Sequence, residues 1–130
     1  MENIHVPVSP GEVLDKITIL EIKSERMDDP EKVANVRVEL KLLQDTWAQN
    51  ISDDDVIRDL HAQLMEINEA LWEIEDDIRD KERVKEFDER FIELARAVYF
   101  TNDKRSEVKK KLNLHLGSEI VEEKSYQDYA

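Results

Sequence analysis

Cysteine is absent from this chain of 130 residues, which also contains only two glycines and three prolines. Without cysteine there is no disulfide framework, no thiolate metal site and no cysteine nucleophile. The shortage of glycine and proline leaves few tight turns and favours long helices. The length suits one domain with one core, which we place over residues 1–130.

Targeting and membrane segments are missing from the pattern as well. Residues 1–10 have neither the basic start nor the apolar stretch of a secretory signal. No apolar run approaches the roughly 20 residues that cross a bilayer. We therefore expect a cytoplasmic protein that is not inserted in a membrane.

Acidic side chains outnumber basic ones, and the net charge is −13. A field of this sign repels nucleic acid and anionic lipid, so we expect neither as a partner. The acidic excess is concentrated in residues 53–93, whereas residues 94–116 carry six basic and two acidic side chains. We expect this basic segment to fold against the acidic one. An anion-binding site on the basic segment is the alternative.

Helical periodicity is what the sequence has in abundance. Seven apolar residues follow one another in alternate steps of three and four, which is the spacing of a helix packed along its whole length. They are Ile57, Leu60, Leu64, Ile67, Leu71, Ile74 and Ile78. A second apolar run over residues 84–98 begins after a slip in phase at Lys81. We expect one long helix through Lys81 or a kink between residues 80 and 86.

Two helix-start signals occupy the first part of the chain. Ser9, Pro10 and Glu12 have the spacing of a capped start, which predicts a helix over residues 10–27. The pair Asp29–Pro30 repeats the signal and predicts a second helix up to about residue 50.

The later boundaries depend on single residues. Ser52 is the expected cap of the central helix. Residues 99–103 predict a corner before a last helix, which should end at Gly117. The elements together predict an all-α, antiparallel helical bundle with a long central helix. Residues 4–8 and 119–122 resemble short strands, so the N-terminal arm and the C-terminal tail could pair.

No motif of known catalytic chemistry is evident. The acidic row within residues 66–80 could hold Mg²⁺, as in the all-α nucleotide pyrophosphohydrolases, but its carboxylates follow one helix instead of converging from two. Residues 14–27 superficially resemble the first helix of the all-helical chorismate mutases, although the first half of this helix has no arginine. We expect no metal and no cofactor.

Several polar side chains lie where the apolar pattern predicts burial, and buried charges need partners. These ligand-binding candidates are Asp15, Lys16, Glu75, Arg79, Arg96, Asn102, Asp103 and Arg105. If Lys16, Arg79 and Arg96 converge in an open cleft, they form an anion pocket. If the candidates lie in a closed core, they form structural ion pairs.

Four stretches resemble an uncharacterised family of small bacterial proteins, a domain of unknown function. Residues 6–23 read VPVSPGEVLDKITILEIK and residues 117–126 read GSEIVEEKSY. Residues 91–99, FIELARAVY, and residues 101–103, TND, fit the same family. The resemblance implies that both ends of the chain belong to the folded domain, and it implies no activity.

The leading interpretation is a helical interaction or regulatory domain. Two apolar runs and a broad apolar face on residues 10–27 are hard to bury in one monomer of this size, so we expect a homo-oligomer or another protein partner. One alternative is a metal-dependent or small-molecule enzyme that uses carboxylates of the central helix. The other is a binder of anions or sugar phosphates that uses residues 96–111.

Overall fold

The structure, a computed structural model, describes residues 1–123 and 125–129. It contains the helices α1 (Pro10–Arg26), α2 (Pro30–Asn50), α3 (Asp55–Arg83) and α4 (Glu89–His115). The described residues form no strand, and the predicted all-α bundle is confirmed. Within them, no helix is long and apolar enough to cross a membrane.

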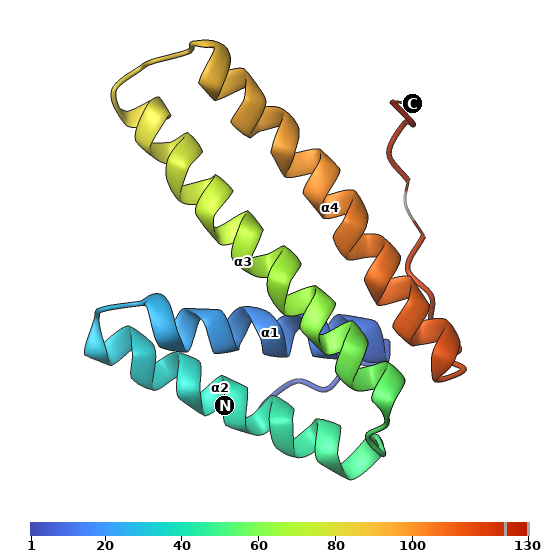
Figure 1. Cartoon of the computed structure of the whole chain (residues 1–130). Coiled ribbons are helices and arrows are strands. Elements are labelled where there is room, and N and C mark those ends of the chain that lie inside the picture. The colour runs from blue at the N-terminus through green and yellow to red at the C-terminus, as the bar shows by residue number, and fades with distance from the viewer. Residues whose placement is uncertain (124, 130) are drawn as a thin grey trace.

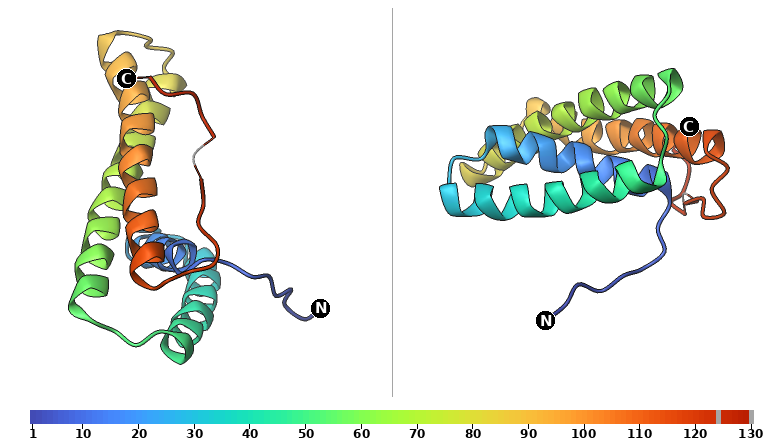
Figure 2. Two further views of the ribbon diagram at one scale, coloured as in Figure 1. Left: turned by 90° about the vertical axis from the view of Figure 1, so that its right-hand side faces the viewer. Right: turned by 90° about the horizontal axis from the view of Figure 1, so that it is seen from below.

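Two antiparallel hairpins cross one another (Figure 1). α1 and α2 form the first hairpin and α3 and α4 form the second, and α1 packs against both helices of the second hairpin. The views in Figure 2 show α2 on the far side of α1, away from α3 and α4. The crossing is therefore the one place where three helices meet, and outside it each hairpin is two helices thick.

The buried core lies at this crossing. Its main cluster consists of Leu14, Ile57, Leu60, Leu64, Val108 and Leu112, from α1, α3 and α4. Only the first half of the apolar seam on α3 is buried, and the seam residues from Ile67 to Ile78 are half-buried. No residue of α2 is buried, because α1 is the one helix that packs along it.

Side-chain caps begin all four helices. Ser9, Asp29, Asp54 and Asp88 each accept a hydrogen bond from a backbone N–H of the first turn that follows. The predicted starts of α1 and α2 are confirmed. The cap of α3 is Asp54, whose Oδ1 accepts from the N–H of Ile57 at 2.8 Å, so the prediction of Ser52 was wrong by two residues. A carboxylate complements the positive end of the helix better than a hydroxyl does.

The prediction of a continuous or kinked helix through Lys81 is wrong. α3 ends at Arg83, and the chain reverses before α4 begins at Glu89. Lys85 takes a φ of 56°, and the N–H of Glu86 bonds to the carbonyl of Lys81 at 3.0 Å, which closes the helix end. The ammonium of Lys81 donates to Glu86 and Asp88 at 2.9 Å each and holds the turn. This lysine interrupts the apolar phase because it lies at a hairpin turn.

The predicted corner at residues 99–103 is also wrong, because α4 is continuous through this stretch. Asn102, within this stretch, accepts a weak hydrogen bond from Arg105 at 3.4 Å. The predicted end at Gly117 is confirmed. Gly117 has a φ of 65°, and the N–H of Ser118 bonds to the carbonyl of Asn113 at 2.9 Å.

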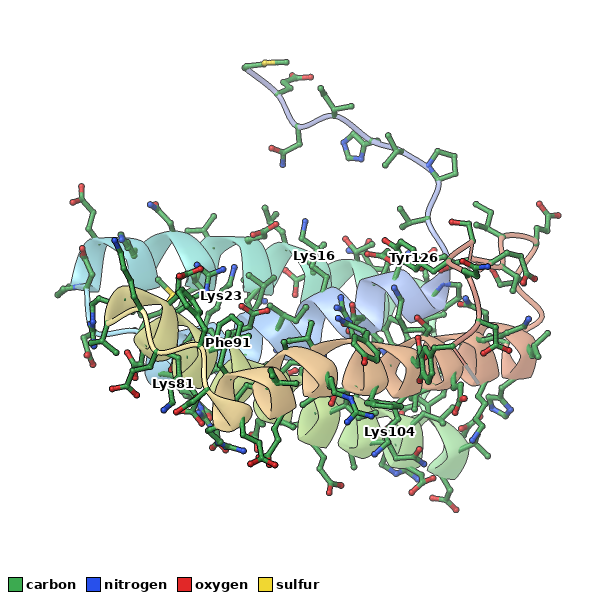
Figure 3. All side chains as sticks on the ribbon, turned by 90° about the horizontal axis from the view of Figure 1, so that it is seen from above. Lys16, Lys23, Lys81, Phe91, Lys104 and Tyr126 are labelled. Carbon is green, nitrogen blue, oxygen red and sulfur yellow. The ribbon has the colours of Figure 1, made fainter. Side chains whose placement is uncertain are left out.

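The two ends of the chain take separate paths. Residues 1–8 are exposed and extend away from the helices, as Figures 2 and 3 show. The tail, which we define as residues 118–123 and 125–129, runs back beside α4 (Figure 1). The suggested pairing of residues 4–8 with residues 119–122 is therefore not found, and neither segment is a strand.

Candidate functional site

A buried carboxylate lies at the centre of the crossing. Asp15 of α1 is 1% exposed. Arg105 of α4 donates from Nε to its two oxygens at 2.9 and 3.1 Å and from Nη2 to Oδ2 at 2.5 Å. Asn68 of α3 donates from Nδ2 to Asp15 at 2.9 Å and to the hydroxyl of Thr18 at 2.7 Å. One carboxylate thus joins three helices.

The pair of Asp15 and Arg105 is a charge-assisted, forked contact. Its hydrogen bonds raise the pKa of Arg105, although burial acts in the opposite direction. A buried carboxylate is tolerated when its charge is paired and its remaining lone pairs are satisfied, as they are here. Asp15 has almost no surface left for a ligand, so its contribution is to position the three helices.

A second cation lies beside this pair, at the start of α1. Lys109 of α4 donates to Glu12 at 2.8 Å and to Glu122 of the tail at 2.9 Å, and its ammonium is 3.9 Å from Asp15. Burial lowers the pKa of Lys109, but the hydrogen bonds to Glu12 and Glu122 outweigh burial, and the pKa is raised. Lys109 therefore stays charged and connects the tail to the crossing.

α1 and α4 approach one another closely at Gly11. A Cβ atom at this position would lie 2.6 Å from the backbone carbonyl oxygen of Lys109, so only glycine fits. The N–H of Gly11 donates to Oδ1 of Asn113 at 2.7 Å. This bond fixes which way the amide of Asn113 is turned.

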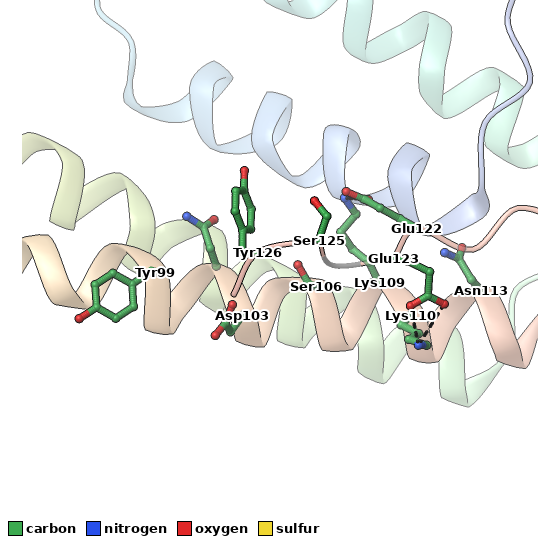
Figure 4. A pocket seen from close by; sticks show the side chains of 11 residues that line it. Tyr99, Asp103, Ser106, Lys109, Lys110, Asn113, Glu122, Glu123, Ser125 and Tyr126 are labelled. Atoms are coloured by element: carbon green, nitrogen blue, oxygen red, sulfur yellow. Dashed lines mark hydrogen bonds and ion pairs between the residues drawn. The ribbon is translucent and has the colours of Figure 1, made fainter. Parts of the chain in front are cut away.

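Two clefts open beside the buried network. The crossing cleft, of about 400 Å³, is lined by Lys23 of α1, by Trp72 and Glu75 of α3, and by Asn102 and Arg105 of α4. The tail cleft, of about 410 Å³, lies between α4 and the tail (Figure 4). Its lining includes Ser106, Lys109, Lys110 and Asn113 from α4 and Glu122 and Glu123 from the tail.

The candidate residues from the sequence do not form one site. Asp15, Asn102 and Arg105 come together at the crossing. Glu75 lines the crossing cleft with Asn102 and Arg105, and Asp103 lines the tail cleft. The structure therefore groups four of the candidates around the crossing cleft or the ion pair behind it.

Lys16, Arg79 and Arg96 do not converge. Lys16 pairs with Glu39 at 2.9 Å, and Arg79 pairs with Glu75 at 3.2 Å on the outside of α3. The guanidinium of Arg96 lies over the ring of Phe100 at 5.7 Å. The anion pocket that depended on these three cations is not formed.

Sequence reasoning missed Asn68 and Asn113, and it included Lys109 only as part of the basic segment 96–111. Asn68 lies one turn after the buried Leu64, and Lys109 and Asn113 each follow a buried apolar residue directly. That spacing was the available signal, since it places each of them on the edge of a buried face. The apolar periodicity of α3 and α4 does not predict which edge of their buried faces another helix covers. In the structure, α1 covers the edge that carries these residues.

α4 packs against α3, so the expectation that the basic segment folds against the acidic one is confirmed, but the cations of this segment mostly pair elsewhere. Arg105 and Lys109 pair with α1, and Lys110 pairs with Glu123 of the tail at 3.4 Å. Acidic residues of α3 pair with other cations: Glu73 with Arg26 of α1, and Asp80 with Arg83 of α3 itself. Among the described residues, no group of three or more histidine, aspartate and glutamate side chains is placed to hold a metal ion.

Aromatic side chains gather on one surface. All three phenylalanines and all three tyrosines lie between residues 87 and 129, and none of them is in the buried core of the described chain. We define the aromatic strip as Ile92, Tyr99 and Phe100 of α4 with Tyr129 of the tail. The rings of Tyr99, Phe100 and Tyr129 lie 4.9–5.3 Å apart. A hydrogen bond to Asp103 raises the pKa of Tyr129 to about 12.

Comparison with known protein families gives a match over residues 4–129 with a family to which no function is assigned. No curated protein matches the chain, and no solved structure matches it. The matched residues include the four helices, the crossing and the aromatic strip.

Proposed function

The chain belongs to DUF6165, a family of unknown function, and from that premise we propose that it is a helical interaction domain that dimerises through the aromatic strip. The observation that carries the proposal is the solvent exposure of the side chains of the aromatic strip. Ile92, Tyr99, Phe100 and Tyr129 are 55%, 43%, 39% and 51% exposed, although they are large and mostly aromatic. Tyrosine, phenylalanine and arginine are enriched at the centres of protein interfaces, and Arg96 already lies over Phe100.

The order of charges along α4 supports a second copy as the partner. Glu89 and Glu93 precede Phe100 on its face of the helix, and Lys104 and Lys111 follow it at helical spacing. In an antiparallel contact centred on Phe100, Glu89 of one copy lies opposite Lys111 of the other, while Glu93 lies opposite Glu107. In a dimer with a two-fold axis the pairing of Glu89 with Lys111 occurs twice, once at each end of the paired α4 helices.

The remaining charges and the length of this face are compatible with such a contact. Lys104 and Lys111 form no ion pair within the described residues, and Glu107 is the one acidic residue between them. From Glu89 to Lys111 the face is about 33 Å long at the rise of an α-helix. That length suits an interface of standard size.

Light scattering at micromolar concentration tests the proposal. We expect twice the monomer mass for the wild-type protein and the monomer mass for the double variant Ile92→Ser, Phe100→Ser. Both side chains are exposed, so the variant should keep its helical circular dichroism. Leu42→Ser is the matched control, because it removes an exposed apolar side chain from α2 and should leave the dimer intact. A monomeric wild-type protein would contradict the proposal.

A further inference from the structure

The tail cleft contains a buried hydrogen-bond donor that has no acceptor. Asn113 is 1% exposed, and its Nδ2 has no hydrogen-bond partner among the described residues. Its Oδ1 is held by the N–H of Gly11, so the amide cannot be turned around without breaking that bond. A buried donor left unpaired is costly, and such atoms are usually satisfied by water, an ion or a ligand.

Other donors surround the same space. Lys109, Lys110 and Ser106 line the cleft with Asn113, as Figure 4 shows from close by. They lie on one side of α4 within two helical turns, in the basic segment of residues 94–116. Two ammonium groups, an amide and a hydroxyl are a donor set that suits the several oxygens of a phosphate group.

The acidic groups of the cleft come mostly from the tail. Glu122 accepts from Lys109 at 2.9 Å and Glu123 accepts from Lys110 at 3.4 Å. Both glutamate side chains are exposed, so they contact the lysines from the solvent side of the cleft. Asp103, the acidic residue that α4 contributes to the lining, is hydrogen-bonded to Tyr129.

We propose that the tail cleft binds the phosphate group of a small phosphate monoester, with Asn113, Lys109, Lys110 and Ser106 as donors and with Glu122 and Glu123 of the tail as internal competitors. The tail carboxylates then occupy the lysines only while the ligand is absent. Tyr99 and Tyr126 also line the cleft and provide ring faces for the rest of such a molecule. The phosphate donors of this site lie outside the aromatic strip, and Tyr99 is the residue that the two surfaces share.

The competition predicts opposite effects for two substitutions. In Glu122→Gln, Glu123→Gln the competing charges of the tail are gone while Glu12 still pairs with Lys109, and we expect binding about tenfold tighter than for the wild type. In Asn113→Asp the acceptor for Gly11 is kept while the donor is replaced by an anion, and we expect binding at least about tenfold weaker. Glu119→Gln is the matched control, since it removes a tail carboxylate that does not line the cleft.

Isothermal titration calorimetry of the full chain with inorganic phosphate, adenosine monophosphate and glucose 6-phosphate measures these effects, with adenosine as the uncharged probe. Tighter binding of a monoester than of phosphate supports a ligand with a ring, and binding of phosphate alone contradicts that part. Ser106→Ala, an exposed position, replaces Asn113→Asp if the latter loses its helical signal. No binding at about 10 mM by the wild type and the glutamine variant, or equal affinity in all variants, would overturn the site.

Discussion

Asp15 is the side chain on which the crossing of the two hairpins depends. It accepts from Arg105 of α4 and from Asn68 of α3, and it is almost completely buried. Removing one partner of a buried pair leaves the other charge uncompensated. Its value therefore lies less in net stabilisation than in fixing how three helices meet.

Asp15→Asn should lower the free energy of unfolding by about 3–5 kcal/mol, because Arg105 would keep its charge without a counter-charge. Urea unfolding followed by circular dichroism measures this loss. Lys16→Ala is the neighbouring control, since its pair with Glu39 is exposed and should contribute under about 1 kcal/mol. A loss within about 1 kcal/mol for Asp15→Asn would show that the pair does not hold the crossing.

His61 gives the fold a pH dependence. Its Nε2 lies 3.3 Å from Glu21 of α1, and this hydrogen bond raises the pKa of His61 above its ordinary value of 6.5. The folded state thus favours the protonated form. The stabilisation is fully present below pH 6.5 and is lost as the pH rises through the higher pKa of the folded state.

The free energy of unfolding should therefore decrease across this window by about 0.5 kcal/mol, a small value because the pair is partly exposed. Urea titrations at several pH values, for the wild type and for His61→Gln, isolate the effect from the other histidines. Identical pH profiles for the two proteins would exclude the pair with Glu21 as its source.

Among the helices, the turn between α3 and α4 shows where sequence patterns stop being informative. Residues 84–88 contain neither glycine nor proline, and Lys85 adopts a left-handed conformation that lysine disfavours. The hairpin forms because α3 and α4 pack along their length, and that tertiary contact outweighs the local preference. The phase slip at Lys81 marked the place in the sequence, but it did not predict that the chain reverses there.

Lys85→Gly should stabilise the protein by about 0.5–1 kcal/mol, because glycine adopts this φ without a steric cost. The comparison protein is Lys85→Ala, which removes the same side chain but keeps the Cβ atom. We expect a higher melting temperature for the glycine variant alone, measured by thermal unfolding. Equal melting temperatures of the two variants would mean that the turn carries no strain.

The predictable parts of the fold are those with local causes. The starts of α1 and α2 and the end at Gly117 follow from capping residues, and the existence of α3 follows from its seam. Asp15 and Arg105 were recognisable as charges at positions predicted to be buried. Asn68 and Asn113 were not, because the crossing of α1 over the second hairpin decides their burial, and no local pattern encodes that crossing.

In the whole molecule, the apolar side chains are divided between a buried core at the crossing and an exposed surface on α4. The core at the crossing is aliphatic, while the phenylalanines and tyrosines lie outside it on α4, on the turn before it and on the tail. The basic excess lies on α4 as well, in a chain whose net charge is −13. The two interaction sites that we propose, one for a second copy and one for a phosphate group, both use this helix.

Sedimentation equilibrium of three charge variants tests the two-fold contact of α4 most directly. Glu89→Lys and Lys111→Glu should each weaken the dimer by about tenfold, because these two residues lie opposite one another in a contact centred on Phe100 and each exchange places like charges together. The variant that carries both exchanges restores opposite charges across the axis and should regain the wild-type dissociation constant. Additive weakening in the double variant, or a wild-type protein that stays monomeric, would contradict dimerisation through the aromatic strip.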